Sequence, residues 1–265
     1  MRNICMVVSY DGTAYYGFQT QPGGNTIQDK IESAIRSLTG ETVSIIGSGR
    51  TDAGVHALGQ VFNFKTESRI PVERWCLALN SWLPDDIVVL SAREVPPDFH
   101  ARYAAKRKTY RYTINTNRFP DVVHRRFQLH HPAPLDLNAM REALQFIVGE
   151  HDFTSFTSTK SPLSSHVRTI YEAEIATETM QNPNLPDPGE VIHIYLTGNG
   201  FLYNMVRIIV GTLIEIGEGK RKSSEMTEIL AARDRSCAGP TAMAHGLMLW
   251  KVEYDEVSAE MQRFS

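Results

Sequence analysis

The sequence predicts an α+β fold with a largely antiparallel sheet and two similar halves. Runs rich in β-branched residues, typical of strands, alternate with runs whose apolar residues recur at helical spacing. Several neighbouring strand-like runs have no helix between them, which favours antiparallel over parallel pairing. The same succession of elements occurs again in the second half. We therefore expect a boundary near residue 103, with domains at 1–103 and 104–265.

The first half opens with a strand-like run at 2–9, which ends at the turn Asp11-Gly12. The apolar residues after Thr26 recur at helical spacing, and Gly40 provides the end of this helix. The remaining expected elements are strands at 43–47, 60–65 and 86–95 and a helix that starts after Pro71.

The second half begins with an alternating strand at 108–115 and an amphipathic helix at 137–149, which ends at a glycine. The other expected elements are strands at 167–177, 190–198 and 247–254 and helices at 202–216 and 225–233.

Composition is that of an ordinary globular protein, with 42% apolar and 22% charged residues in a chain of 265. The sequence lacks an apolar run of about eighteen residues that would span a bilayer. Its N-terminus reaches Asp11 too early for a signal peptide, so we expect a cytoplasmic protein. The three cysteines are far apart and the histidines lack a ligand-like spacing, which argues against disulfides and a structural metal.

Positive charge is clustered although the formal net charge is −3. The main clusters are KRKTYRY at 106–112, the group of Arg118, His124, Arg125 and Arg126, and GKRKS at 219–223. Each alone is consistent with a solvated surface. Only the first interleaves cations with aromatic rings, as a surface for nucleic-acid phosphates and bases would.

Two acid–base features stand apart from these elements. The stretch GSGRTDAGVHALGQ places Asp52 in a glycine-rich loop between two expected strands, where an aspartate commonly just caps the backbone. Arg207 falls inside an otherwise apolar helix, where a cation is costly unless it is paired. It could reach solvent along its own methylenes or meet a carboxylate, and Asp52 is one candidate.

Five segments in order carry a resemblance to a known family: YDGTAYYGFQ, GRTDAGVHALGQV, FHARYAAKRKTYRY, GNGFLYNMVR and AGPTAMAHGL. Together they closely resemble the bacterial tRNA pseudouridine synthase A family over nearly the whole chain. The most specific of them is GRTDAGVHA. The chain departs from the family pattern at Met243 and in the long loop around 180–190.

The resemblance implies a tRNA pseudouridine synthase that isomerises uridine to pseudouridine at positions 38, 39 and 40 of the anticodon stem-loop. Asp52 matches the catalytic nucleophile, and Tyr110 the residue whose ring packs on the target uracil. Arg207 matches the arginine that pairs with the aspartate, Arg50 the one that accompanies base flipping, and Leu247 an aliphatic residue under the base. The family fold joins the sheets of two α+β halves, with the RNA cleft between them. Family members commonly form homodimers, which contact the tRNA anticodon arm.

The chemistry is compatible with these residue types. Isomerisation is redox-neutral, so the reaction needs no cofactor, and a nearby guanidinium favours the ionised carboxylate that a nucleophile requires. Stacking on Tyr110 would offset much of the cost of flipping the base.

Two other classes remain open from the residues alone. A non-catalytic tRNA-binding protein or RNA chaperone would use the same basic and aromatic surface. A nucleoside hydrolase would need a second carboxylate, which the loop around Asp52 does not supply.

Overall fold

The computed structural model describes residues 1–158, 165–180 and 189–255. Within these ranges the chain has ten strands, mainly antiparallel, and five α-helices, which confirms the predicted α+β class. Two compact units are distinct: Met1–Lys108 with Met248–Ser265, and Thr109–Leu247. A compact unit need not coincide with a domain, so the division near residue 103 stays a prediction. Most of the loop expected around 180–190 lies outside the described residues.

The first unit contains a sheet in which β1 occupies an inner position. Its strands are β1 (Arg2–Tyr10), β2 (Ile46–Gly47), β3 (His56–Thr66), β4 (Ile87–Val95) and β10 (Leu247–Tyr254). Their order is β4-β1-β3-β10, with β2 added to β3. β1 is antiparallel to both neighbours, whereas β10 runs parallel to β3 and places Met248 opposite His56.

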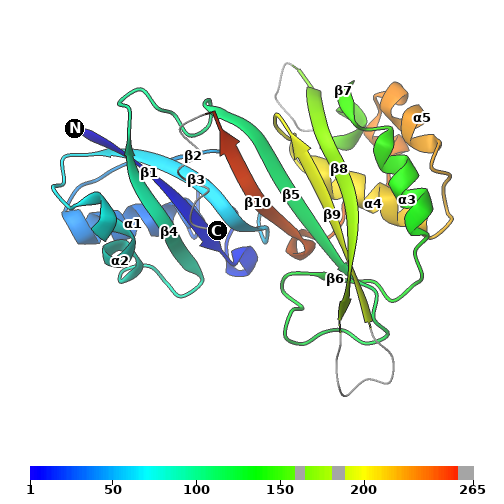
Figure 1. Cartoon of the computed structure of the whole chain (residues 1–265), viewed down its shortest axis with the longest axis horizontal. Coiled ribbons are helices and arrows are strands. Elements are labelled where there is room, and N and C mark those ends of the chain that lie inside the picture. Colours follow the sequence, from blue (N-terminus) through cyan, green and yellow to red (C-terminus); the bar gives the residue numbers. More distant parts are fainter. Residues whose placement is uncertain (159–164, 181–188, 256–265) are drawn as a thin grey trace. The chain divides into compact units, whose positions relative to one another are not determined.

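Helices α1 (Ile27–Thr39) and α2 (Trp75–Asn80) pack beside these strands (Figure 1). α1 begins with a capping box, in which Thr26 and Asp29 bond each other's backbone amides. It ends at Gly40, whose φ of 76° is in the left-handed region that favours glycine. Its apolar face is fully buried, because Ile27, Ile31 and Ile35 are each 0% exposed.

The second unit repeats the combination of antiparallel strands and helices. It contains β6 (Leu129–His130), β7 (Gly149–Asp152), β8 (Val167–Met180) and β9 (Gly189–Gly198). β5 (Ala105–Asn115) begins in the first unit and contributes the residues from Thr109 on to the second. From there the order is β5-β9-β8-β7, with β6 parallel to β5.

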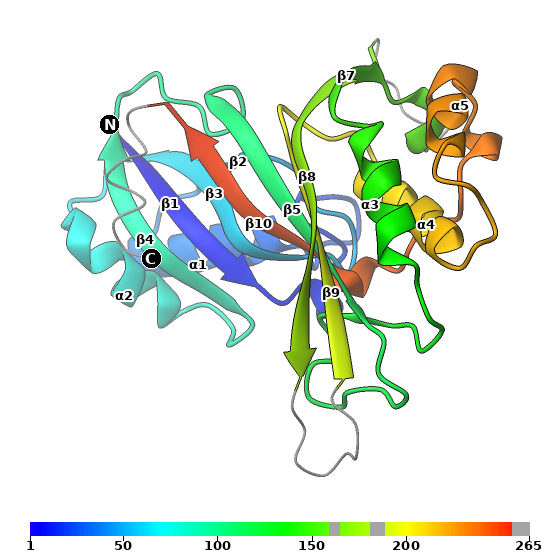
Figure 2. The same ribbon diagram turned by 45° about the vertical axis from the view of Figure 1, so that its right-hand side comes forward.

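The helices of the second unit are α3 (Leu137–Gln145), α4 (Met205–Gly217) and α5 (Glu225–Ala232). α3 and α4 lie next to each other, and α3 also packs against β8 (Figure 2). Ten of the thirteen residues of α4 are buried, so this helix forms the centre of the unit's core. Arg207, which is half-buried, interrupts this apolar composition in the first turn.

Several element boundaries differ from the predicted ones. The predicted strand at 43–47 is reduced to β2, and α3 ends at Gln145 rather than at the glycine that follows. α4 starts at Met205 because Asn204, with a φ of 61°, has left-handed backbone and cannot continue a right-handed helix. The short strands β6 and β7 were not predicted. Among the described residues, none of the helices has the length and hydropathy needed to cross a membrane.

Candidate active site

Asp52 lies in the loop between β2 and β3, and its backbone is held on both sides. The Val55 amide donates to the Asp52 carbonyl at 3.1 Å, which closes a turn that includes Gly54 with a φ of 76°. The amide of Phe18 donates to the carbonyl of Thr51 at 3.0 Å, and that of Gly54 to the carbonyl of Tyr15 at 3.3 Å. The loop is therefore fixed by the aromatic segment 10–18.

Two glycines let that aromatic segment approach the loop. A Cβ on Gly17 would lie 2.6 Å from the Thr51 carbonyl oxygen, and Gly17 also has a φ of 92°. A Cβ on Gly12 would overlap the carbonyl oxygen of Val55. The glycines in YDGTAYYGFQ are thus required by close backbone packing against the residues that flank Asp52.

Side chains around the loop add further support. The hydroxyls of Tyr10 and Thr51 are hydrogen-bonded at 2.8 Å, and burial raises the pKa of Tyr10. His56 is 0% exposed, and its Nδ1 accepts the amide of Gly12 at 3.0 Å and lies 3.2 Å from Asp11 Oδ1. His56 is close to Asp52 in sequence, but this bond gives it a structural role.

Ser48 and Gln60 form a buried polar pair at the start of the loop. Ser48 Oγ donates to Gln60 Oε1 at 2.6 Å, and Gln60 Nε2 donates to the Gly49 carbonyl at 2.9 Å. Both side chains are 0% exposed. The sequence reasoning assigned no role to either residue, although a glutamine beside the apolar run VFNF was a usable signal.

Asp52 itself is half-buried, and Arg50, two residues earlier, is exposed. A partly buried carboxylate on a fixed loop can be directed at a substrate while it stays ionised, provided that a cation or hydrogen-bond donors stabilise it. Both predicted residues of the first unit are thus on one loop.

Tyr110 lies in β5 in the second unit and is 8% exposed. Its ring meets that of Phe201 edge to face, with the centroids 5.0 Å apart and an interplanar angle of 81°. Phe201 belongs to the segment GNGFLYNMVR and thus limits how the Tyr110 ring can turn.

Arg207 is anchored by the loop that contains Met243. Its Nε donates to the Ala242 carbonyl at 2.7 Å, and one terminal nitrogen donates to Asn204 Oδ1 at 3.0 Å. The amide of Ala242 in turn donates to the Arg207 carbonyl at 3.0 Å. These bonds fix the orientation of the Arg207 guanidinium. Arg207 therefore does not simply extend into solvent from its apolar helix.

Tyr112 connects this loop to β5. Its hydroxyl donates to the Met243 carbonyl at 2.9 Å; burial raises its pKa, and the charge of Arg207 partly opposes that shift. Leu247, 5% exposed, begins β10 with its amide donating to the Ala244 carbonyl. Met243 departs from the family pattern, but its contact with Tyr112 involves only its backbone carbonyl.

The five predicted site residues therefore fall into two groups: Arg50 and Asp52 in the first unit, and Tyr110, Arg207 and Leu247 in the second. The pairing of Asp52 with Arg207, and the joint use of both groups on one base, stay predictions.

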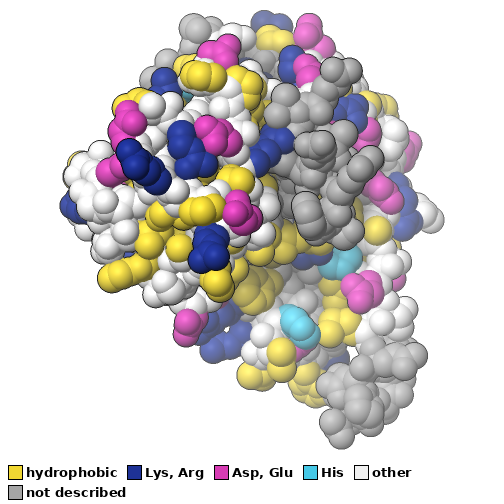
Figure 3. All heavy atoms as spheres, turned by 60° about the vertical axis from the view of Figure 1, so that its left-hand side comes forward, with side chains coloured by type: hydrophobic (Ala, Val, Ile, Leu, Met, Phe, Trp, Pro, Cys, Tyr) yellow, Lys and Arg dark blue, Asp and Glu magenta, His cyan; other side chains and the backbone are white. Residues whose placement is uncertain are grey.

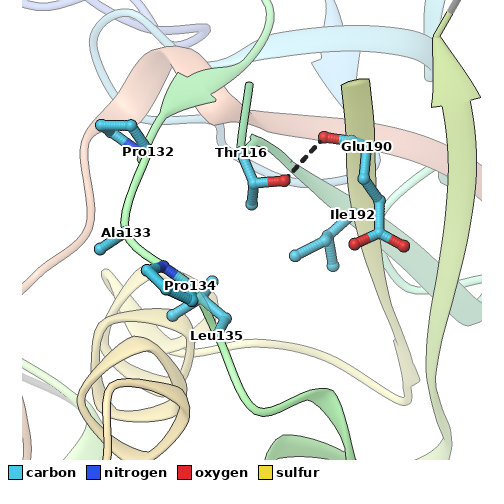
Figure 4. Close-up of a pocket in the computed structure, with 7 residues that line it drawn as sticks. All are labelled: Thr116, Pro132, Ala133, Pro134, Leu135, Glu190 and Ile192. Carbon is cyan, nitrogen blue, oxygen red and sulfur yellow. Dashed lines mark hydrogen bonds between the residues drawn. The ribbon is translucent and has the colours of Figure 1, made fainter. Parts of the chain in front are cut away.

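The pocket in Figure 4 has a volume of about 330 Å³ and lies in the second unit. It is lined by Thr116, the run Pro132–Leu135, Glu190 and Ile192, and includes none of the five site residues. A space-filling view of one face has basic side chains interspersed with acidic and hydrophobic ones (Figure 3). This distribution is consistent with the small net charge.

Comparison with known proteins gives consistent matches. The family model described as tRNA pseudouridine synthase matches residues 6–104 and 143–255. A protein called tRNA pseudouridine synthase A from Brevibacillus brevis is 49% identical over 96% of this chain and 100% of its own. Its namesake from Exiguobacterium is 49% identical over 97% of this chain and 100% of its own. That from Moorella thermoacetica is 51% identical over 94% and 98% respectively.

The fold and these matches define an α+β protein of the pseudouridine synthase class. The chain belongs to the tRNA pseudouridine synthase family, as the resemblance of its five segments predicted.

Proposed function

We propose that this chain isomerises uridine to pseudouridine at positions 38, 39 and 40 of the tRNA anticodon stem-loop, with Asp52 as the nucleophile. The enzyme class, an isomerase that forms pseudouridine in tRNA, follows from membership of the family. The observation that supports Asp52 as the nucleophile is its loop, whose flanking residues are fixed by the aromatic segment while the carboxylate remains half-buried. Positions 38, 39 and 40 are proposed from the family resemblance.

The reaction breaks the N1–C1′ bond of uridine and forms a C5–C1′ bond. The base turns between the two steps, C5 loses its proton, and N1 gains one. Atoms and electrons balance without an external oxidant or reductant, so the proposal requires no cofactor. The ionised carboxylate of Asp52 attacks the nucleoside and is released when the new bond forms.

The other four residues have supporting roles in this proposal. The Arg207 guanidinium, oriented by Ala242 and Asn204, keeps Asp52 ionised. The ring of Tyr110 stacks on the flipped uracil, and Leu247 supplies an apolar surface beneath it. Arg50 is exposed and contacts the RNA while the base leaves its stack.

The tRNA anticodon arm is the RNA partner in this proposal. A homodimer and a cytoplasmic location are further proposals from the family resemblance. The mass in solution, relative to 29.8 kDa for one chain, would test the first of them.

Mapping of pseudouridine in an unmodified tRNA transcript tests the reaction and its position together. After incubation with the purified protein, we expect new pseudouridine at positions 38, 39 or 40 in transcripts that carry uridine there. A transcript in which those uridines are replaced by cytidine is the matched control and should gain none. Tight binding without any new pseudouridine would instead support the RNA chaperone class.

A further inference from the structure

Lys108 connects β5 to the loop that leads into Asp52. Its Nζ donates to the Ser48 carbonyl at 2.6 Å. Next to that carbonyl is Gly49, on which a Cβ would lie only 3.4 Å from the same Nζ. Arg50, Thr51 and Asp52 follow directly in the chain. The ammonium is therefore in place beside the start of the catalytic loop.

The acceptor of this hydrogen bond is held firmly. The Ser48 amide donates to the Val61 carbonyl at 2.7 Å, and the buried Ser48 and Gln60 side chains are bonded to each other. Because Gln60 also holds the Gly49 carbonyl, both residues next to the ammonium have fixed backbones. The ammonium thus has a defined position with respect to the loop.

The charge of Lys108 is not balanced within the part of the chain that the structure describes. An ammonium has three N–H donors, and the Ser48 carbonyl takes one of them. None of the ion pairs between described residues includes Lys108. The charged group that acts on it is Arg102, from the segment before β5, and the loop side contributes the neutral backbone of Ser48 and Gly49.

The surroundings of Lys108 disfavour the protonated form of its amino group. Partial burial, with a further contribution from the positive charge of Arg102, lowers the pKa of Lys108 to about 8. A partly desolvated cation is costly unless an anion accompanies it. The protein therefore retains an unfavourable positive charge at this point, and a bound anion would relieve it.

We propose that Lys108 binds a backbone phosphate of the RNA substrate and so fixes the RNA directly to the loop of Asp52. This inference rests on the proposed function only in taking tRNA as the ligand. Phosphate oxygens accept from the two remaining N–H donors and supply the missing negative charge, with exposed Arg102 beside them. Such a contact sets the position of the RNA without reading its bases.

The salt dependence of tRNA binding tests the contact. We expect Lys108→Met to bind tRNA about tenfold more weakly, since it lacks a charged hydrogen-bond donor. Its plot of log affinity against log salt should be less steep by about one unit. Lys108→Arg should keep the slope of the parent protein. Lys65→Met removes the same charge from an exposed position in the same unit and is the matched control, with unchanged binding.

A second measurement uses the unaltered protein and does not depend on the folding of a variant. Phosphate binding should return the pKa of Lys108 toward the ordinary lysine value of about 10.4, so binding should take up close to one proton near pH 9. Calorimetry in two buffers with different ionisation enthalpies measures this number. Lys108→Arg should lose the uptake and keep the affinity, because arginine stays protonated.

Two results would overturn the proposal. One is a Lys108→Met variant that keeps the salt slope of the parent but isomerises slowly, which would show that Lys108 only positions the loop. The other is tRNA binding by the parent protein without proton uptake near pH 9. Binding is read without turnover, so a protein that binds as expected and forms no pseudouridine contradicts the proposed function alone.

Discussion

At the scale of single residues, the Asp52 loop combines what sequence could and could not predict. Asp52 and Arg50 were identifiable because glycine and small residues around a lone carboxylate are unusual beside a strand. The side chains that hold the loop in place could not be identified from the sequence, because their contacts depend on where distant side chains point. Ser48 and Gln60 meet across a turn, and Lys108 reaches the same place from a strand sixty residues later. Periodicity does not record such contacts.

Gly17 provides a test of how the loop is supported. Gly17 and Gly23 both have positive φ, of 92° and 103°, so alanine at either position should cost about 1 kcal/mol of backbone strain. A Cβ at position 17 also lies 2.6 Å from the Thr51 carbonyl, whereas one at position 23 has open space within 4 Å. We therefore expect Gly17→Ala to lower the free energy of unfolding by about 1–3 kcal/mol more than Gly23→Ala does.

Urea unfolding measures the free energy of unfolding of both variants. Their isomerisation rates show whether the substitution also disturbs the position of Asp52. The Gly17→Ala variant should also isomerise uridine more slowly, because the loop segment that contains Thr51 and Asp52 must shift to make room for the added methyl group. Equal stability losses at positions 17 and 23, with full activity in both, would mean that the aromatic segment does not support the loop.

At the scale of elements, local signals predicted helices better than short strands. α1 was predictable because its buried face, its Thr26 cap and its Gly40 end all lie within fourteen residues of one another. β7 could not be predicted from the sequence, because its four residues form a strand only through pairing with β8. Similarly, Ile45 falls outside β2, and its amide donates instead to the carboxylate of Glu32 at 3.0 Å. A side chain from α1 thereby ends a ladder that hydrophobicity alone would continue.

The cap of α1 predicts a pH dependence. Partial burial acts to raise the pKa of Asp29, but hydrogen bonds from Thr20 and Thr26 outweigh it and hold that pKa below its usual value. A carboxyl whose pKa is depressed by folding stabilises the protein above its unfolded-state pKa, which is about 3.9. That contribution is lost as the pH falls through the lower, folded-state pKa.

We therefore expect Asp29→Asn to be less stable than the parent protein at pH 7, with a smaller difference near pH 3. Thermal unfolding across this range measures it. Asp98→Asn, at an exposed position in the same unit, is the control and should change little at either pH. A difference for Asp29→Asn that is independent of pH would exclude the charge of the cap as its cause.

At the scale of the whole molecule, the pairing that begins β3 joins distant parts of the sequence. Met248 lies opposite His56, just after the Asp52 loop, although almost two hundred residues separate the strands. The elements themselves were predictable from local patterns, but this parallel pairing was not, because it depends on how the complete chain folds back. It places β10, which begins at Leu247, beside β3, the strand that follows the Asp52 loop.

The central claim is that the Asp52 carboxylate carries out the isomerisation. Its most direct test is the release of tritium from tRNA labelled at uridine C5, since the C5 hydrogen must leave when C5 bonds to C1′. Asp52→Asn keeps the size of the side chain and removes the nucleophilic charge, so we expect the rate to fall by about a thousandfold or more. Asp98→Asn should release tritium at the parent rate. Release by Asp52→Asn at close to the parent rate would contradict the account.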